Sequence, residues 1–119
     1  LIEADISSHQ SFVVEEDGKI VGTFAFIIGE DPTYQVIEKG AWRSTEPYGT
    51  IHRIASNGQV KGLAHQVFDF CYQEIPHLRI DTHADNKPMQ AAILSYGFTE
   101  CGVIYVADGS PRLAYDYYR

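Results

Sequence analysis

The stretch that most constrains the fold runs from Tyr48 to Phe70 and reads YGTIHRIASNGQVKGLAHQVFDF. Gly49 to Ala55 is predicted to be a short strand, and the chain from Gln59 onward an amphipathic helix. One face of that helix is predicted to carry Leu63, Ala64, Val67, Phe70 and Cys71. A strand that turns at once into a helix leaves free backbone N–H groups at the helix start. Together with the helix dipole, those groups predict an anion site.

The first residues of this helix strengthen the prediction. Gln59, Val60 and Lys61 include no carboxylate that would offset the dipole. Lys61 also adds a positive charge where the dipole disfavours one. We therefore expect a negatively charged ligand at this helix end.

Length and charge exclude several classes of protein. With 119 residues the chain is long enough for one domain with one core, and 45% hydrophobic residues are ordinary for a soluble globular protein. The formal net charge of −7 argues against nucleic acid or an anionic membrane as partner, because phosphate binding needs a basic surface. No apolar run is long enough to span a bilayer and no signal peptide is seen, so the cytoplasm is expected. Because the chain begins at Leu1 without Met, a fragment is also expected.

The cysteines and most histidines suggest no metal or disulfide chemistry. Cys71 and Cys101 lie in apolar sequence without a C-x-x-C motif, and are expected to be buried free thiols in a reducing compartment. His83 and Asp85 resemble a metal pair only faintly, since no third ligand is in sight, and no metal is expected. The remaining histidines outside the central strand, expected at the surface, are His9, His65 and His77.

The other elements follow from apolar patterns and turn signals. Leu1 to Ser8 is expected to be the end of a helix. Strands are expected at Phe12–Glu15, Ile20–Ile28, Leu78–Thr82, Phe98–Val106 and Arg112–Tyr118, with turns at Asp17-Gly18 and Asp108-Gly109. The nearly continuous apolar run from Ile20 to Ile28 predicts a central strand buried on both faces.

A second helix is expected between an Asn86 N-cap and a Gly97 C-terminal cap. Its buried face is predicted to hold Met89, Ala92, Ile93 and Tyr96. The preceding strand, helix and strand imply a parallel pair with a right-handed connection. One α/β domain with a mixed sheet is therefore expected over residues 1–119.

The stretch from Gly29 to Pro47 is the least regular. It is expected to be an ordered loop with a short strand or helical turn at Tyr34–Ile37. Loops of this length are often functional. The alternative, left open, is a surface excursion in which Trp42 covers the edge of the core.

Two motifs resemble one known family. Gln59 to Ala64 has the form Q-x-x-G-x-A and resembles the pyrophosphate loop, [QR]-x-x-G-x-[GA], of the GCN5-related N-acetyltransferases (GNAT). Asn86 followed by Gly97-Phe98 resembles the family's second segment, N-x(10)-G-F. The order of elements is also that of the GNAT fold, from about Phe12 to the C-terminus. The family usually begins with a strand and two helices that form part of the acceptor site, and we expect that region to be lacking here.

The resemblance implies a GNAT-like acyl-CoA N-acyltransferase fold: a mixed, mostly antiparallel sheet with a parallel, splayed central pair. It also implies acetyl-CoA as co-substrate, with the pantetheine amides pairing with backbone groups of Ile54 and Ser56 as an added strand would. The pyrophosphate would rest on the amides of Val60 to Ala64. Asn86 would contact the pantetheine arm or simply cap its helix. The implied coenzyme-binding set is Ile54, Ala55, Ser56, Gln59, Val60, Lys61, Gly62, Leu63, Ala64 and Asn86.

The resemblance leaves the catalytic residues open. Many members supply the acid for the leaving thiolate as a Tyr at the position that Ile93 holds here. Tyr96, one turn further on, is a core residue or that acid, and Tyr105 has no motif behind it. For the base we favour His52, on the strand leading to the thioester, with a buried, hydrogen-bonded histidine as the alternative. Glu30 is a second candidate base, acting through water.

Two functions are compatible with this sequence. The first is an acetyl-CoA-dependent N-acetyltransferase that acetylates a primary amine of a small molecule or peptide, with the acidic balance favouring a cationic acceptor. The second is a non-catalytic acyl-CoA-binding or interaction domain, which the missing Tyr and the short N-terminus favour. A homodimer is expected as well, because the strand at Phe12–Glu15 and the strand at Arg112–Tyr118 are predicted to be open sheet edges.

Overall fold

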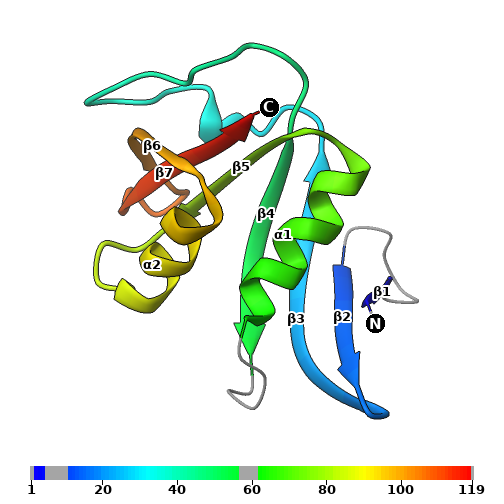
Figure 1. The fold of residues 1–119 in the computed structure, drawn as a ribbon. Coiled ribbons are helices and arrows are strands. Elements are labelled where there is room, and N and C mark those ends of the chain that lie inside the picture. Colours follow the sequence, from blue (N-terminus) through cyan, green and yellow to red (C-terminus); the bar gives the residue numbers. More distant parts are fainter. Residues whose placement is uncertain (1, 5–10, 57–61, 119) are drawn as a thin grey trace.

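The protein is described by a computed structural model that covers residues 2–4, 11–56 and 62–118 (Figure 1). Within these residues, seven strands form one sheet in the order β1-β2-β3-β4-β5-β7-β6. The strands are β1 (Ile2–Ala4), β2 (Ser11–Glu16), β3 (Lys19–Ile28), β4 (Gly49–Ser56), β5 (His77–Thr82), β6 (Thr99–Tyr105) and β7 (Pro111–Tyr118). Only β4 and β5 run parallel among the pairs described; the other neighbours are antiparallel. This is the mixed sheet with a parallel central pair expected from the sequence.

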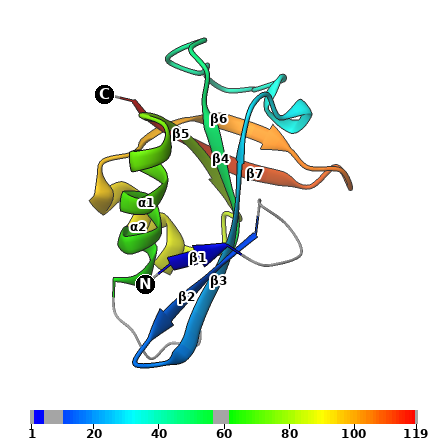
Figure 2. The ribbon, with the colours of Figure 1, turned by 90° about the vertical axis from the view of Figure 1, so that its right-hand side faces the viewer.

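Two helices, α1 (Leu63–Glu74) and α2 (Lys87–Tyr96), cover one side of the sheet, and the short 3-10 helix η1 (Pro32–Tyr34) lies on the other (Figure 2). The main core fills the space between the helices and the sheet. Its fully buried members on the helices are Val67, Phe68, Cys71 and Ile93. A smaller core of Tyr34, Tyr48, Ile104 and Ala114 lies apart from it. In the described residues, no helix is both long enough and apolar enough to cross a membrane.

Most local signals in the sequence are confirmed. The carboxamide oxygen of Asn86 accepts the Met89 N–H, and Gly97 ends α2 with its N–H on the carbonyls of Ile93 and Leu94. Helix α1 ends at Glu74, and Ile75 and Pro76 follow it, since proline does not continue a helix. Its buried face also includes Phe68, whereas Ala64 and Phe70 are only half-buried.

The predicted helix end at Leu1–Ser8 is wrong where the structure describes it. Ile2–Ala4 forms strand β1, which pairs antiparallel with β2 through Ile2↔Val14 and Ala4↔Phe12. A few apolar residues are too short a segment to show whether the spacing is that of a helix or of a strand. Pairing with the neighbouring strand therefore determines the conformation of this segment. Strand β1 therefore covers the edge at Phe12–Val14 that had been predicted to be open.

The C-terminal strand is not an edge either. Strand β7 lies between β5 and β6, so the outer strand is β6. Its edge is partly covered, because Glu38 and Val103 exchange two backbone hydrogen bonds of 2.8 Å. The two open edges behind the dimer prediction are thus occupied at these positions, and the homodimer stays a prediction without that support.

The expectation that β3 is buried on both faces is also wrong. Val21, Phe24 and Phe26 are buried, but Ile20 and Ile28 are 57% and 56% exposed. Strand β3 pairs antiparallel with β2 and β4, and antiparallel sheets often have one solvated face. A continuous apolar run does not reveal which face will be covered.

The loop from Gly29 to Pro47 is ordered, as expected, and contains η1 and the bridge at Glu38. It lies close to β6: a Cβ on Gly40 would stand 1.9 Å from the carbonyl oxygen of Cys101. Trp42 packs against Tyr34, with ring centroids 5.2 Å apart, and its indole N–H donates to the Tyr34 carbonyl at 2.8 Å. The loop is therefore a packed layer over the sheet.

The packing of α2 gives a matched test. Ile93 is fully buried, whereas its neighbour Leu94 is 51% exposed. Ile93→Ala should lower the free energy of unfolding by about 2–5 kcal/mol through the cavity it leaves. Leu94→Ala should stay within about 0.5 kcal/mol of the parent. Urea unfolding of both variants measures the difference, and equal losses would contradict the described orientation of α2.

Candidate functional site

The site begins where the parallel pair β4–β5 separates. Their pairing runs through Gly49↔Leu78 and Thr50↔Arg79 to Ile51↔Ile80. Beyond that point β4 continues to Ser56 and β5 to Thr82, and Figure 1 shows the two strands diverging. Two strands that part inside a sheet leave polar backbone available to a ligand. The splayed central pair expected from the sequence is confirmed.

A β-bulge in β4 lies at the same point. Ala25 of β3 faces His52, and Thr23 faces Ala55, so β4 has one residue more than β3 between the two pairs. Within this bulge Arg53 has a φ of +56°, which is uncommon for a residue other than glycine. Bulges bend a strand and re-aim its side chains. The sequence around His52 thus turns β4 away from β5.

A cavity of about 200 Å³ opens between the diverging strands. Residues from β4, β5, β7 and the start of α2 line it: Ile51, Arg53, Ile54, Ile80, Asp81, Thr82, His83, Asn86, Met89 and Arg112. Two predicted coenzyme-binding residues, Ile54 and Asn86, are among them. Asn86 also caps α2, so the structure brings its two proposed roles to one place.

The start of α1 has the character of an anion site. Its N-cap is Gly62, with a φ of 76°, no side-chain cap bond and no acidic residue in the first turn. Leu63 is buried and Ala64 half-buried, so their backbone N–H groups, not their side chains, are suited to a ligand. Of the other predicted coenzyme residues, Ala55 and Ser56 are exposed at the end of β4. Gln59, Val60 and Lys61 lie outside the described residues.

The predicted base, His52, is paired with a carboxylate that the sequence did not single out. Its Nε2 lies 3.1 Å from Asp31 Oδ2, and the two side chains are 27% and 17% exposed. Asp31 follows Glu30 at the end of β3 and caps η1, its Oδ1 accepting the Thr33 N–H at 2.9 Å. An Asp before Pro reads as a turn residue, and no local pattern connects it to His52.

Tyr34 connects this pair to the cavity. Its ring centroid lies 6.4 Å from that of His52, and its hydroxyl donates to Asp81 Oδ1 at 2.5 Å. Asp81 lines the cavity, whereas His52 itself does not, although its neighbours Ile51 and Arg53 do. Burial, and then the Asp81 charge, raise the pKa of Tyr34 well above its usual value, so this phenol remains protonated.

The other predicted catalytic residues lie elsewhere. Glu30 is exposed next to Asp31. The Tyr96 hydroxyl donates to Asp69 Oδ1 of α1 at 2.6 Å. Burial first, and then the Asp69 hydrogen bond, raise the pKa of Tyr96, which makes it a weaker acid. These contacts fit the core alternative for Tyr96. Tyr105, exposed on β6, donates its hydroxyl to Glu38 Oε1 at 3.0 Å.

The remaining histidines and cysteines show no metal site. In the described part of the chain, no three potential ligands gather. The His83 Nδ1 accepts the Asp85 N–H at 3.0 Å and lies 3.5 Å from Asp85 Oδ2. Cys71 and Cys101 are buried free thiols, as expected. Burial raises the pKa of Cys101 to about 12. His65 is half-buried and contacts Ser95, and His9 lies outside the described residues.

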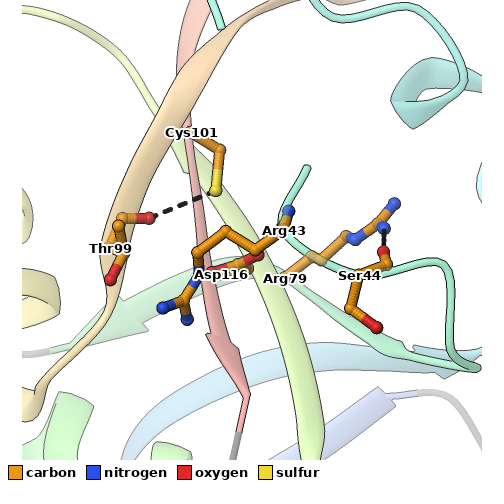
Figure 3. Close-up of polar contacts among 6 residues, drawn as sticks. All are labelled: Arg43, Ser44, Arg79, Thr99, Cys101 and Asp116. Carbon is orange, nitrogen blue, oxygen red and sulfur yellow. Dashed lines mark hydrogen bonds and ion pairs between the residues drawn. The ribbon is translucent and has the colours of Figure 1, made fainter. Parts of the chain in front are cut away.

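The surface assignment of His77 is wrong, because it is 1% exposed and belongs to a polar clamp. We use the term polar clamp for the buried side chains of His77, Arg79 and Asp116, which hold the loop segment 43–46. His77 Nδ1 lies 3.1 Å from the Glu46 carbonyl oxygen, and Arg79 donates to that of Ser44 at 2.8 Å. Figure 3 shows Arg43 and Asp116 together with Arg79 and Ser44.

The strongest contact of the polar clamp joins Arg43 Nε to Asp116 Oδ1 at 2.5 Å. The Arg79 guanidinium lies over the rings of Trp42 and Tyr48, 4.1 Å and 3.9 Å from their centroids. A cation over aromatic faces is attracted by their quadrupoles. The loop that carries Asp31 and Tyr34 is therefore fixed from its other end.

Solved structures with the same architecture are acetyltransferases. A GNAT-family acetyltransferase from Streptococcus agalactiae is 33% identical, with a TM-score of 0.83 over 92% of this chain. A candidate acetyltransferase from Staphylococcus aureus is 25% identical, with a TM-score of 0.69; the match covers 96% of this chain and 74% of that one. An aminoglycoside acetyltransferase in complex with coenzyme A and kanamycin shares the fold at 18% identity, with a TM-score of 0.64 over 92% of this chain and 66% of that one.

The chain spans 65% of the length of the Streptococcus agalactiae acetyltransferase. No family model matches the sequence, and no curated protein matches it. The similarity to the Streptococcus agalactiae acetyltransferase therefore rests on the shared arrangement of the elements and on identical residues at 33% of the aligned positions.

The buried imidazole of the polar clamp gives a pH-dependent test. Burial, and then the charge of Arg79, lower the pKa of His77 in the folded protein. An unfolded imidazole titrates near about 6.5. The folded state thus loses stability as pH falls below that value, until the lower folded pKa is passed. His77→Asn keeps an N–H near the position of Nδ1 and cannot titrate.

We expect urea unfolding between neutral and mildly acidic pH to show a smaller loss of stability in His77→Asn than in the parent. Leu94→Ala provides the control, since removing an exposed side chain that does not titrate should keep the parental slope. An unchanged slope in His77→Asn would contradict a buried neutral imidazole.

Proposed function

We propose that this chain, which is 33% identical to a GNAT-family acetyltransferase, is itself a GCN5-related N-acetyltransferase and transfers an acetyl group from acetyl-CoA to a primary amine of a small molecule or peptide. The observation that carries the proposal is the separation of β4 and β5 next to a helix N-terminus without cap or carboxylate. Such a site suits an extended ligand with amides at one end and phosphates at the other. The two buried free thiols fit a reducing compartment, and we place the reaction in the cytoplasm.

The residues present fit the coenzyme, which supplies an acyl group activated as a thioester. Backbone groups of β4 after Ile51 would pair with the pantetheine amides, and Asn86 and Met89 would flank that arm. Gly62 and the N–H groups of Leu63 and Ala64 would bind the pyrophosphate. The first turn of α1 has no acidic residue that would repel this anion or offset the helix dipole. An aminoglycoside acetyltransferase of the same fold is in complex with coenzyme A, which supports coenzyme A as the ligand proposed here.

His52 is the base in this proposal. It accepts the proton that the acceptor amine loses. In the same reaction the amine nitrogen would form a bond to the acyl carbon, and the bond between that carbon and sulfur would break. His52 would then return this proton through water to the departing thiolate, because the Tyr96 hydroxyl is engaged with Asp69. Glu30 acting through water remains the alternative base, since it is exposed at the same end of β3. A positioned base typically contributes about 10²–10⁴-fold in rate.

The acceptor proposed is cationic in its free form. The net charge of −7 attracts cations, and Asp31 and Asp81 place two carboxylates on the side of the sheet that the loop covers. Thiol release from acetyl-CoA across a panel of primary amines tests the activity. Release with one class of amine supports transfer. Coenzyme binding without release from any amine would instead identify a non-catalytic acyl-CoA-binding domain.

Coenzyme binding at the start of α1 can be tested at Gly62. Gly62→Glu places a negative charge where the pyrophosphate is expected, so the affinity for coenzyme A should fall tenfold or more, about 1.4 kcal/mol. Isothermal titration calorimetry measures this. Gly62→Asn, which tolerates the left-handed backbone, reports how much of the loss comes from strain and bulk alone. Equal affinity in Gly62→Glu and the parent would place the coenzyme elsewhere.

The role of His52 predicts a pH profile. The kcat/KM of the parent should fall as acid protonates the imidazole, since a protonated base cannot accept the amine proton. His52→Gln should lose about 10²–10⁴-fold in kcat/KM near neutral pH and should lack this acidic limb. Coenzyme affinity should be unchanged. A profile in the variant that matches the parent would transfer the role to Glu30 or to water.

A further inference from the structure

We propose that Asp31 is a positioning residue that holds His52 in the tautomer protonated on Nε2, so that Nδ1 presents its lone pair to the acceptor amine. The inference rests on the proposed function, in which His52 is the base. It adds a residue for which neither motif provides a signal, and it states which ring nitrogen does the chemistry.

The hydrogen bond fixes the tautomer. His52 Nε2 lies 3.1 Å from Asp31 Oδ2, within hydrogen-bonding distance. An ionised carboxylate has no proton to give, so in a neutral imidazole this nitrogen must be the donor. The other ring nitrogen, Nδ1, then carries the lone pair. A carboxylate in this position also stabilises the imidazolium that forms when the amine proton arrives.

Asp31 is itself held in place by three further contacts. Its backbone N–H donates to the Tyr48 hydroxyl oxygen at 2.8 Å, and its Oδ1 accepts the Thr33 N–H at 2.9 Å. Its carbonyl oxygen accepts the Tyr34 N–H at 2.9 Å. The two carboxylate oxygens thus have different partners, and Oδ2 is directed to His52. Groups fixed in this way do not have to reorganise during the reaction.

Among the described residues, Asp31 is the hydrogen-bond partner given for the imidazole and Tyr34 is its aromatic neighbour. Tyr34 packs beside it, but the Tyr34 hydroxyl donates to Asp81. On the strand side, His52 precedes the bulge at Arg53, which turns β4 away from β5. The ring is 27% exposed, so an acceptor can reach it. The loop, the strand bulge and the Asp31 carboxylate together fix the orientation of the His52 ring, with Nε2 toward Asp31.

The test reads the tautomer directly. Nitrogen-15 NMR of the imidazoles in the full chain, at a pH at which the ring is neutral, should show the His52 proton on Nε2. In Asp31→Asn the amide oxygen is required by the Thr33 N–H, which leaves the amide NH₂ facing Nε2. The proton should therefore move to Nδ1, and kcat/KM should fall by about 10²–10⁴-fold, the usual contribution of a general base.

Asp17→Asn makes the same change of charge in the β2–β3 turn, and it should alter neither the tautomer nor kcat/KM. A parent protein with the proton on Nδ1 overturns the proposal. So does an Asp31→Asn variant with the parental tautomer, or one with a switched tautomer and full kcat/KM. If Asp31→Asn does not fold, the parental tautomer still decides. If no amine is acetylated, the proposed function fails, while the NMR result still tests the Asp31–His52 pair.

Discussion

The parallel pairing of β4 and β5 stops at Ile51↔Ile80, and the site depends on that stop. In a continuous sheet, every backbone N–H and C=O on facing strand edges finds a partner. Here a bulge at Arg53 follows the last β4–β5 pair, and a cavity of about 200 Å³ lies between the two strands. An extended ligand that supplies amides can occupy the place of the missing strand partner, as in β-strand addition. The fold thus provides a candidate binding site by interrupting its own hydrogen bonding.

The polar clamp explains why a long loop can form part of a rigid site. Burying Arg79 and Asp116 away from water is unfavourable unless each finds partners. Arg43 and the Ser44 carbonyl supply them, and the rings of Trp42 and Tyr48 cover the Arg79 guanidinium. Segment 43–46 is fixed through these contacts. Tyr48, which follows this segment, accepts the Asp31 N–H through its hydroxyl and so connects it to Asp31. The buried polar groups that hold the loop thereby stabilise the geometry of the Asp31–His52 pair.

Local signals in the sequence were sufficient for most of the elements and for the frame of the site. The Asn86 cap, the Gly97 stop, strand β4 and helix α1 each depend on a few adjacent residues, and a resemblance to known motifs connected them. Contacts between distant segments were not predictable. Asp31 and His52 are 21 positions apart, and His77 is buried because a loop 31 positions away in sequence covers it. Strand β1 was missed because three residues have no period of their own.

The alternation of side chains along β4 and β5 separates the two tasks of the site. Ile51 and Ile80 are buried in the core under the helices, while the next residues, His52 and Asp81, meet Asp31 and Tyr34 under the loop. Successive residues of a strand point to opposite faces, so a shift by one residue would exchange these sets. Packing of Ile51 and Ile80 against the helices fixes the register. The same apolar contacts that stabilise the fold therefore hold the two polar side chains on the opposite face, beside the cavity.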